Sequence, residues 1–148
     1  MSGSYELRTA RPEDVGGVTA LLAAVDLPFD DISPTLDGFW VAVDVAEILG
    51  TIGLERYGHA ALLRSVATSP SARGTGIGAA LVERAIDGAK AAGITDLYLL
   101  TTTAVEWAPR FGFAPVARNR VAEAVRGSPQ FTGGTCSSAV AMHRVLGD

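Results

Sequence analysis

Cysteine and histidine are scarce in this 148-residue chain, which contains only Cys136, His59 and His143 of these two types. A single cysteine excludes a disulfide within the chain, and two histidines far apart in sequence provide no cluster for a four-ligand zinc site. We therefore expect no metal site. The same cysteine usage favours a reducing compartment, which in a cell is the cytoplasm.

Long apolar runs are missing as well. The most apolar stretch, residues 39–54, is interrupted by Asp44 and Glu47, and no segment reaches the about 20 apolar residues of a membrane span. The first residues, MSGSYELRTARPED, do not contain the apolar core of a signal peptide. The sequence therefore predicts a cytoplasmic protein without membrane partners.

Basic residues do not dominate the charge, because 12 Lys and Arg stand against 16 Asp and Glu, giving a net charge of −4. A nucleic-acid surface needs many cations placed over phosphates, so nucleic acid is not an expected partner. A local basic pocket for one small anion remains compatible with this balance. The length and the 48% hydrophobic content predict one domain over residues 1–148.

Hydrophobic periodicity predicts a mixed α/β domain. A helix is expected to begin at Pro12 and to bury one apolar stripe, and the clearest helix covers residues 76–92 and ends before Gly93. Shorter helices are expected from Ala104 for about two turns and over residues 121–126. Residues 27–38 are expected to form an irregular loop over a site. Strands are expected at residues 4–9, 39–43, 47–57, 60–68, 97–102, 113–119 and 139–145.

A glycine-rich loop, Arg73-Gly74-Thr75-Gly76-Ile77-Gly78, joins a predicted strand to the clearest predicted helix. Glycines permit a tight turn with accessible N–H groups, and the helix N-terminus adds about half a positive charge. With the cation of Arg73, such a loop can hold a pyrophosphate.

Three other interpretations of this loop exist. Gly74, Gly76 and Ala79 fit the spacing of a dinucleotide-binding loop, but the acid expected at the end of the next strand is absent. A Walker A loop requires Gly-Lys-Ser/Thr, which the chain does not contain. A turn that only joins a strand to a helix is the third interpretation.

The pattern Arg73-x-x-Gly76-x-Gly78 resembles the Q/R-x-x-G-x-G/A signature of the GCN5-related N-acetyltransferases (GNAT). Residues 63–70 resemble the central strand of that family, and residues 104–113 resemble its A-x-x-F-Y-x-x-x-G-F element. The resemblance covers nearly the whole chain. It implies a GNAT-like acyl-CoA N-acyltransferase fold, with a mixed sheet splayed between strands 4 and 5 and flanked by helices. In the C-terminal third, including Cys136-x-Ser138-Ala139-Val140-x-Met142, the chain is most similar to the arsenic-resistance N-acetyltransferase branch.

This resemblance implies direct transfer of an acetyl group from acetyl-CoA to the amine of a small molecule. The acceptor is expected to be an amino acid or a related compound, including an organoarsenical or phosphinate analogue of glutamate. A non-catalytic acyl-CoA-binding or sensor module is the alternative, and a homodimer is expected from the habits of the family. The expected cofactor contacts are Val66, Ala67, Thr68, Arg73, Gly74, Thr75, Gly76, Ile77, Gly78, Thr101 and Arg110.

Catalytic residues are less well defined by the sequence. Glu55, near the end of a predicted strand, is the candidate base for the amine, and its alternative role is a surface charge paired with Arg56. The tyrosine that serves as general acid in the family is replaced by Ala108, which leaves Tyr98, or Thr101 through water, as candidates. The arginines expected to bind an anionic group of the acceptor are Arg64 and Arg126.

Overall fold

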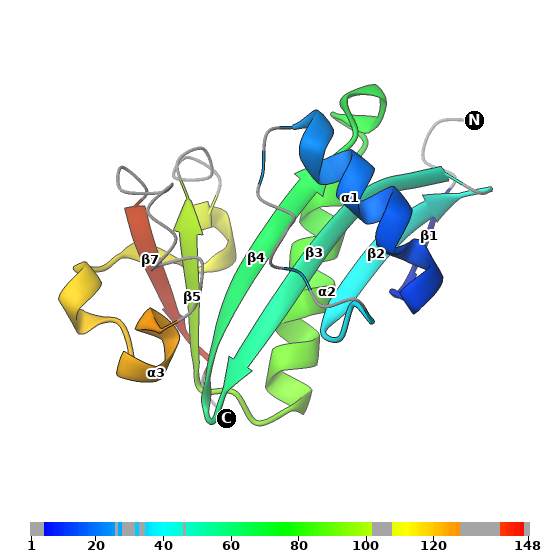
Figure 1. The fold of residues 1–148 in the computed structure, drawn as a ribbon. Coiled ribbons are helices and arrows are strands. Elements are labelled where there is room, and N and C mark those ends of the chain that lie inside the picture. Colours follow the sequence, from blue (N-terminus) through cyan, green and yellow to red (C-terminus); the bar gives the residue numbers. More distant parts are fainter. Residues whose placement is uncertain are drawn as a thin grey trace. The chain divides into compact units, whose positions relative to one another are not determined.

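The computed structural model describes residues 5–25, 27, 32, 35–45, 47–101, 108–127 and 140–146. Within them the helices are α1 (Val15–Ala24), α2 (Ile77–Ala91) and α3 (Glu123–Arg126) (Figure 1). None of the described helices is both long and apolar enough to cross a bilayer. The strands are β1 (Glu6–Thr9), β2 (Phe39–Asp44), β3 (Glu47–Tyr57), β4 (Ala60–Thr68), β5 (Asp96–Thr101), β6 (Ala114–Pro115) and β7 (Val140–Val145).

The strands form a seven-stranded mixed sheet among the described residues, in the hydrogen-bonded order β1-β2-β3-β4-β5-β7-β6. β4 and β5 pair in parallel over Ala60–Leu63 and Asp96–Leu99, whereas β5 and β7 pair antiparallel. The predicted mixed α/β fold with flanking helices is therefore confirmed. The chain forms two compact units, Met1–Gly53 with Ser65–Ala85 and Leu54–Arg64 with Ile86–Asp148.

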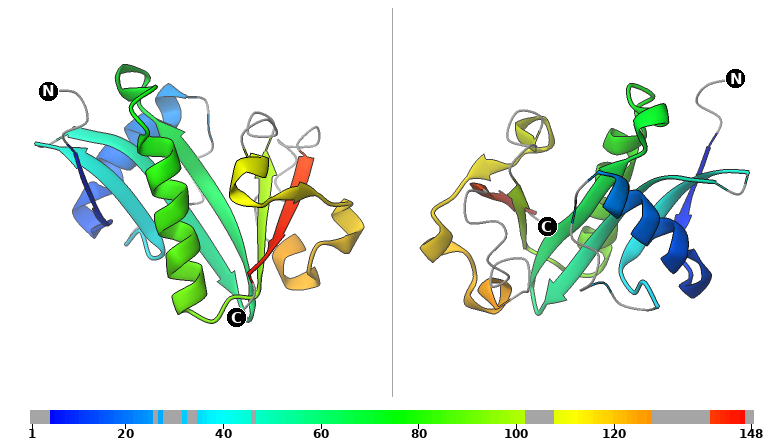
Figure 2. Two further views of the ribbon diagram at one scale, coloured as in Figure 1. Left: turned by 180° about the vertical axis from the view of Figure 1, so that it is seen from behind. Right: turned by 45° about the horizontal axis from the view of Figure 1, so that its top comes forward.

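In the first unit, α1 and the beginning of α2 cover opposite faces of the sheet (Figures 1 and 2). A β-bulge interrupts the pairing of β2 with β3 in this unit, because Ala42 pairs with Gly50 but Val43 pairs with Ile48. The extra residue in β3 shifts the alternation of its side chains between the two faces of the sheet. Ile48 consequently lies under α1, next to Gly17, whereas Gly50 lies under α2.

The core on the α1 side of the first unit confirms the apolar stripe expected after Pro12. Val18, Leu21 and Leu22 of α1 are buried, and they pack with Leu36, Phe39, Val41 and Ala67. Full burial of an aliphatic or aromatic side chain of this size contributes about 1.5–3 kcal/mol. This packing holds α1 on the sheet although Gly16 and Gly17 weaken its helical propensity.

The second unit has its own apolar cluster, in which α3 lies beside the strands β5 and β7 (Figure 1). Buried residues of this cluster come from β4, β5, β7 and the α3 segment. The cluster consists of Ala60, Leu62, Tyr98, Val121, Val125 and Ala141. The short α3, a single helical turn, is thus stabilised by packing and not by its own length.

Two predicted elements of the second unit need correction. The strand predicted at residues 113–119 is limited to Ala114–Pro115. After one further backbone hydrogen bond, from the N–H of Val116 to the carbonyl of Ala141, the chain enters a 3₁₀ turn at Arg118–Arg120. The helix predicted from Ala104 lies partly outside the described residues, and its described part, Ala108–Phe111, is a 3₁₀ turn. The predictions for β3 and β4 agree with the structure at both ends.

Candidate functional site

The glycine loop that precedes α2 has the open conformation expected of a phosphate-binding turn. Gly74 and Gly76 adopt φ angles of +82° and +86°, which side chains other than glycine rarely tolerate. Both residues are exposed, and a Cβ atom built on either would meet no atom within 4 Å. The turn is therefore not filled by side chains of the described residues.

The N–H groups of this loop are mostly uncommitted. The N–H of Ala80 donates to the carbonyl of Gly76 at 3.0 Å and begins the helical hydrogen bonding. Within the described part of the chain, the N–H groups of Gly76, Ile77, Gly78 and Ala79 have no recorded acceptor, as is usual for the first residues of a helix. These groups, together with the positive end of the helix dipole, can bind an anion.

Arg73 adds a cation beside these N–H groups. Its side chain is exposed and forms no ion pair with any residue that the structure describes. By contrast, Thr75 turns inward, because its hydroxyl and its N–H both donate to the carbonyl of Ala72. Thr75 therefore stabilises the turn itself.

Close packing fixes where α2 begins. A Cβ at Gly50 would lie 2.8 Å from side-chain atoms of both Ile77 and Leu81, so only a glycine lets the first turns of α2 approach β3 this closely. A Cβ at Gly78 would lie 3.4 Å from Oγ1 of Thr68, which places the end of β4 directly beside the loop. The loop and the end of β4 thus belong to one packed structure.

The end of β4, Val66–Thr68, follows an irregularity that the sequence does not reveal. Ser65 has a φ of +55°, a left-handed conformation that costs a non-glycine residue about 1–2 kcal/mol. Ala67 is buried in the core under α1, whereas Val66 and Thr68 are partly exposed. No glycine or asparagine marks Ser65 in the sequence, so its conformation depends on the tertiary structure.

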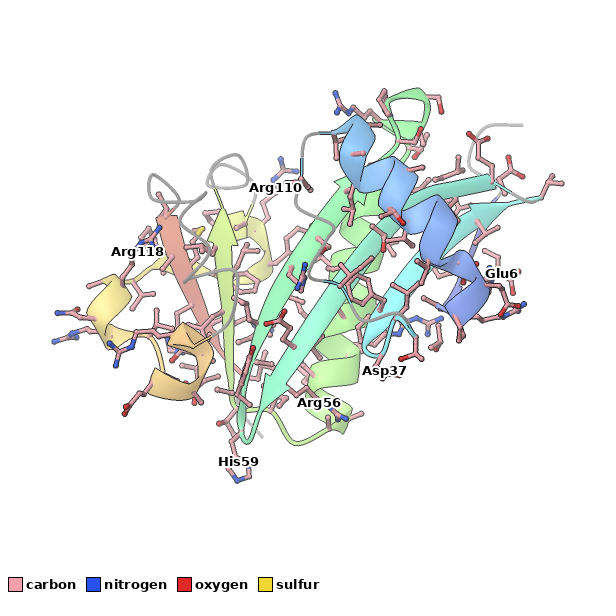
Figure 3. All side chains as sticks on the ribbon, viewed as in Figure 1. Glu6, Asp37, Arg56, His59, Arg110 and Arg118 are labelled. Carbon is pink, nitrogen blue, oxygen red and sulfur yellow. The ribbon has the colours of Figure 1, made fainter. Side chains whose placement is uncertain are left out.

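In the second unit, Glu55 lies within a cluster of hydrogen bonds. Its Oε2 accepts from Nη1 of Arg64 at 2.6 Å, and its Oε1 accepts from the hydroxyl of Tyr57 at 2.7 Å. The side chain of Arg64 is 2% exposed and that of Glu55 is 21% exposed. The pairing of Glu55 with Arg56 is therefore corrected to Arg64, since Arg56 is exposed (Figure 3).

Tyr98, the candidate acid, is placed in the apolar cluster of the second unit. Its ring is 5% exposed and stacks on the ring of His143, with centroids 4.6 Å apart. Burial raises the pKa of the Tyr98 hydroxyl, although a backbone hydrogen bond from Ala122 opposes this shift. His143 in turn pairs with Asp96, with Nε2 and Oδ1 2.9 Å apart.

The remaining candidates are more exposed or less defined. Arg110 in the 3₁₀ turn and Arg126 at the end of α3 are exposed (Figure 3 labels Arg110). Thr101 ends β5, and its side chain is outside the described residues. Cys136 also lies outside them. His59 is exposed in the turn between β3 and β4 and points away from that turn in Figure 3.

A family model for the acetyltransferase (GNAT) domain matches residues 35–115, more than half of the chain. The chain belongs to the GNAT family. It is thus a GNAT acetyltransferase domain, as its resemblance to that family implies. No curated protein sequence matches the chain.

Solved GNAT structures share its fold at low sequence identity. An N-acetylglutamate synthase from Neisseria gonorrhoeae, in complex with coenzyme A and N-acetylglutamate, is 22% identical with a TM-score of 0.83; the alignment covers 97% of this chain but only 35% of that longer one. The protein Rv2747 from Mycobacterium tuberculosis, in complex with CoA, is 22% identical with a TM-score of 0.81. The alignment covers 95% of this chain and 99% of Rv2747. A Staphylococcus aureus GNAT acetyltransferase is 17% identical with a TM-score of 0.76, and the alignment covers 97% of this chain and 100% of that one.

Sequence reasoning did not find Tyr57 in this GNAT domain, whereas the resemblance to the family already pointed to Ala108. Tyr57 was not among the candidates, although alternation along β3 places it on the same face as Glu55. Ala108 stands where the resemblance places the tyrosine that acts as general acid in the family. It is completely buried, and its methyl side chain has no proton to donate.

Proposed function

We propose that the chain transfers an acetyl group from acetyl-CoA directly to the amine of a small molecule that resembles an amino acid. The observation that carries this proposal is the open loop before α2, where the N–H groups of Gly76, Ile77 and Gly78 lack acceptors among the described residues. The pyrophosphate of coenzyme A offers the anionic oxygens that such groups bind, and Arg73 supplies a further cation.

The pantetheine arm then lies along Val66–Thr68. An extended ligand can pair with the N–H and C=O groups of a strand as an added strand does, and this segment ends beside the loop at Thr68. Thr101 and Arg110 are proposed as further contacts of the cofactor.

In the reaction, the nitrogen of the neutral amine attacks the thioester carbonyl, so that a C–N bond forms and the C–S bond breaks. An amine in water is mostly protonated at neutral pH, and Glu55 is proposed to accept its proton. The leaving thiolate needs no acid, because a thiol with a pKa of about 8.5 is a good leaving group. We retain Tyr98, or Thr101 through water, as candidates for its later protonation.

The acceptor is proposed to be an amino acid such as glutamate or a glutamate-like anion. The Neisseria gonorrhoeae neighbour, which binds N-acetylglutamate, supports this class. The segment 108–127 supports it too, since it contains four arginines, including Arg126, and a single acid, Glu123. The similarity of the C-terminal third to the arsenic-resistance branch adds organoarsenical and phosphinate analogues of glutamate.

Replacement of Gly76 tests the pyrophosphate site. Gly76→Ala places a methyl group where the phosphate approaches, and we expect the Kd for acetyl-CoA to rise at least tenfold, about 1.4 kcal/mol, in calorimetric titration. Gly93→Ala is the matched control, because Gly93 has a similar φ of +82° and equally open surroundings at the opposite end of α2. Both variants should lose similar stability, about 1–2 kcal/mol, but only Gly76→Ala should lose affinity.

Acetyl transfer itself is tested by thiol release with a panel of acceptors: glutamate, a glutamate-like arsenical, a phosphinate and simple polyamines. Turnover with the glutamate-like compounds is expected. Tight acetyl-CoA binding without turnover on any acceptor would instead favour the sensor module. Equal affinity of the Gly76→Ala and Gly93→Ala variants would remove the loop as the pyrophosphate site.

A further inference from the structure

The carboxylate of Glu55 is held from two directions by groups that no motif of the family brings together in the sequence. The hydroxyl of Tyr57 donates to Oε1 at 2.7 Å, and the guanidinium of Arg64 donates to Oε2 at 2.6 Å. Each oxygen of a carboxylate can accept two hydrogen bonds. The side chain of Glu55 is 21% exposed, so it is partly accessible to solvent.

Both donors are themselves fixed by packing. Tyr57 and Glu55 are two residues apart on β3, so their side chains lie on the same face of the strand. The ring of Tyr57 packs against the apolar cluster of the second unit, which contains Leu62 and Tyr98. The side chain of Arg64 is 2% exposed, so its guanidinium has little freedom to leave the carboxylate. The orientation of Glu55 is thus determined by the core of this unit.

We propose that Tyr57 and Arg64 are positioning residues that hold Glu55 for proton transfer from the acceptor amine. This inference rests on the proposed acetyltransferase function and on Glu55 as its base. The carboxylate receives one proton from the substrate ammonium, the amine gains its free electron pair, and the proton passes on to solvent. In this role Arg64 acts on the carboxylate and not on an anionic group of the acceptor.

The hydroxyl of Tyr57 is the most selective part of the cluster to remove. In Tyr57→Phe the ring and its packing remain, and the hydrogen bond from the hydroxyl to Glu55 is lost. We expect kcat to fall by about tenfold, because one oriented hydrogen bond is lost from the base, while the KM for acetyl-CoA stays within about twofold. Tyr5→Phe is the matched control, since Tyr5 is also partly exposed, belongs to the first unit and has no recorded partner among the described residues.

A double-variant comparison separates positioning from structure. If Tyr57 acts through Glu55, adding Tyr57→Phe to Glu55→Gln should lower kcat by less than about twofold further, because the base is already absent. Multiplicative effects of the two changes would show that Tyr57 acts independently and would overturn the proposal. An unchanged kcat in the single variant Tyr57→Phe would overturn it as well.

Arg64 is tested with Arg64→Lys, which keeps a cation and avoids an unpaired carboxylate in the interior. We expect kcat to fall while the melting temperature and acetyl-CoA affinity change little. If Glu55→Gln is fully active, the positioning role fails although the acetyltransferase function stands. If the wild-type chain binds acetyl-CoA but acetylates no acceptor, or does not bind it, the proposed function itself fails.

Discussion

At the residue scale, Asp14 shows how one buried carboxylate can organise the beginning of an element. Nη1 and Nη2 of Arg8 donate to its two oxygens at 2.7 and 3.1 Å, and the N–H of Arg11 donates to Oδ2 at 2.7 Å. These bonds tie β1 to the 3₁₀ turn that leads into α1. The hydrogen bonds from Arg8 hold the pKa of Asp14 below its usual value, although burial opposes the shift.

The lowered pKa gives a pH-dependent prediction for Asp14→Asn. A carboxyl group whose pKa is lower in the folded state stabilises the fold above its unfolded pKa of about 3.9 and ceases to do so as the pH falls through the folded value. We expect Asp14→Asn to reduce the free energy of unfolding by about 2 kcal/mol at pH 7, with the difference from wild type shrinking below about pH 4. Urea unfolding across this pH range measures the effect.

Glu13→Gln is the matched control for this experiment. Glu13 is exposed, and its Oε2 lies 3.9 Å from Nη1 of Arg11 in a solvent-screened pair. Glu13→Gln should therefore change the free energy of unfolding by no more than about 0.5 kcal/mol. A pH-independent loss in Asp14→Asn would contradict the assignment of this stability to the ionised carboxylate.

At the element scale, the beginning of α2 depends on a missing side chain in the neighbouring strand. Gly50 of β3 lies under Ile77 and Leu81, and the bulge that pairs Ala42 with Gly50 and Val43 with Ile48 turns Gly50 toward this helix. The first turn of α2 carries the N–H groups of the proposed pyrophosphate site. The strand pairing of β2 and β3 thus fixes the position of a loop that lies more than twenty residues away in sequence.

Gly50→Ala is predicted to disturb both stability and the loop. The added Cβ would lie 2.8 Å from Ile77 and Leu81, and overpacking of this kind costs about 1–3 kcal/mol. We expect lower stability in urea unfolding together with weaker acetyl-CoA binding. Gly16→Ala is the control in α1, where a Cβ meets nothing within 4 Å, and it should stabilise the chain by about 0.5–1 kcal/mol. A gain in stability for Gly50→Ala would contradict the close helix packing.

At the scale of the whole molecule, the net charge of −4 conceals two different units. The first unit contains ten acidic and four basic residues, whereas the second contains six acidic and eight basic residues. Local fields, more than the net charge, govern the approach of small anions to a protein. An acidic chain is therefore compatible with the anionic cofactor of a GNAT domain and with an anionic acceptor.

Ligand-dependent melting of the whole chain discriminates between cofactors. Acetyl-CoA at 100 times its Kd should add about 2.7 kcal/mol to the stability of the folded chain. For a chain of this length we expect the melting temperature to rise by about 5–10 °C. NAD should produce no shift, because the acid that binds its ribose is missing after the next strand. An equal shift with NAD would favour the dinucleotide-binding interpretation of the glycine loop.

Local signals in the sequence were sufficient for much of the fold. Both ends of β3 and β4 were predicted because β-rich runs are bounded there by Gly58-His59 and other turn residues. The glycine loop was found because its function requires bare backbone at a fixed spacing before an amphipathic helix. The strand predicted at residues 113–119 was too long, because hydrophobicity did not reveal the 3₁₀ turn at Arg118–Arg120.

By itself, the sequence determined the elements, the glycine loop and the family, because each is encoded by spacing along the chain. Only the tertiary structure decided that Glu55 pairs with Arg64, since these residues are nine apart in sequence and meet because β3 and β4 are neighbours in the sheet. It also decided that Tyr98 lies in a packed cluster and that Ser65 adopts a left-handed conformation. These features arise from contacts between elements, for which no short stretch of sequence carries a signal.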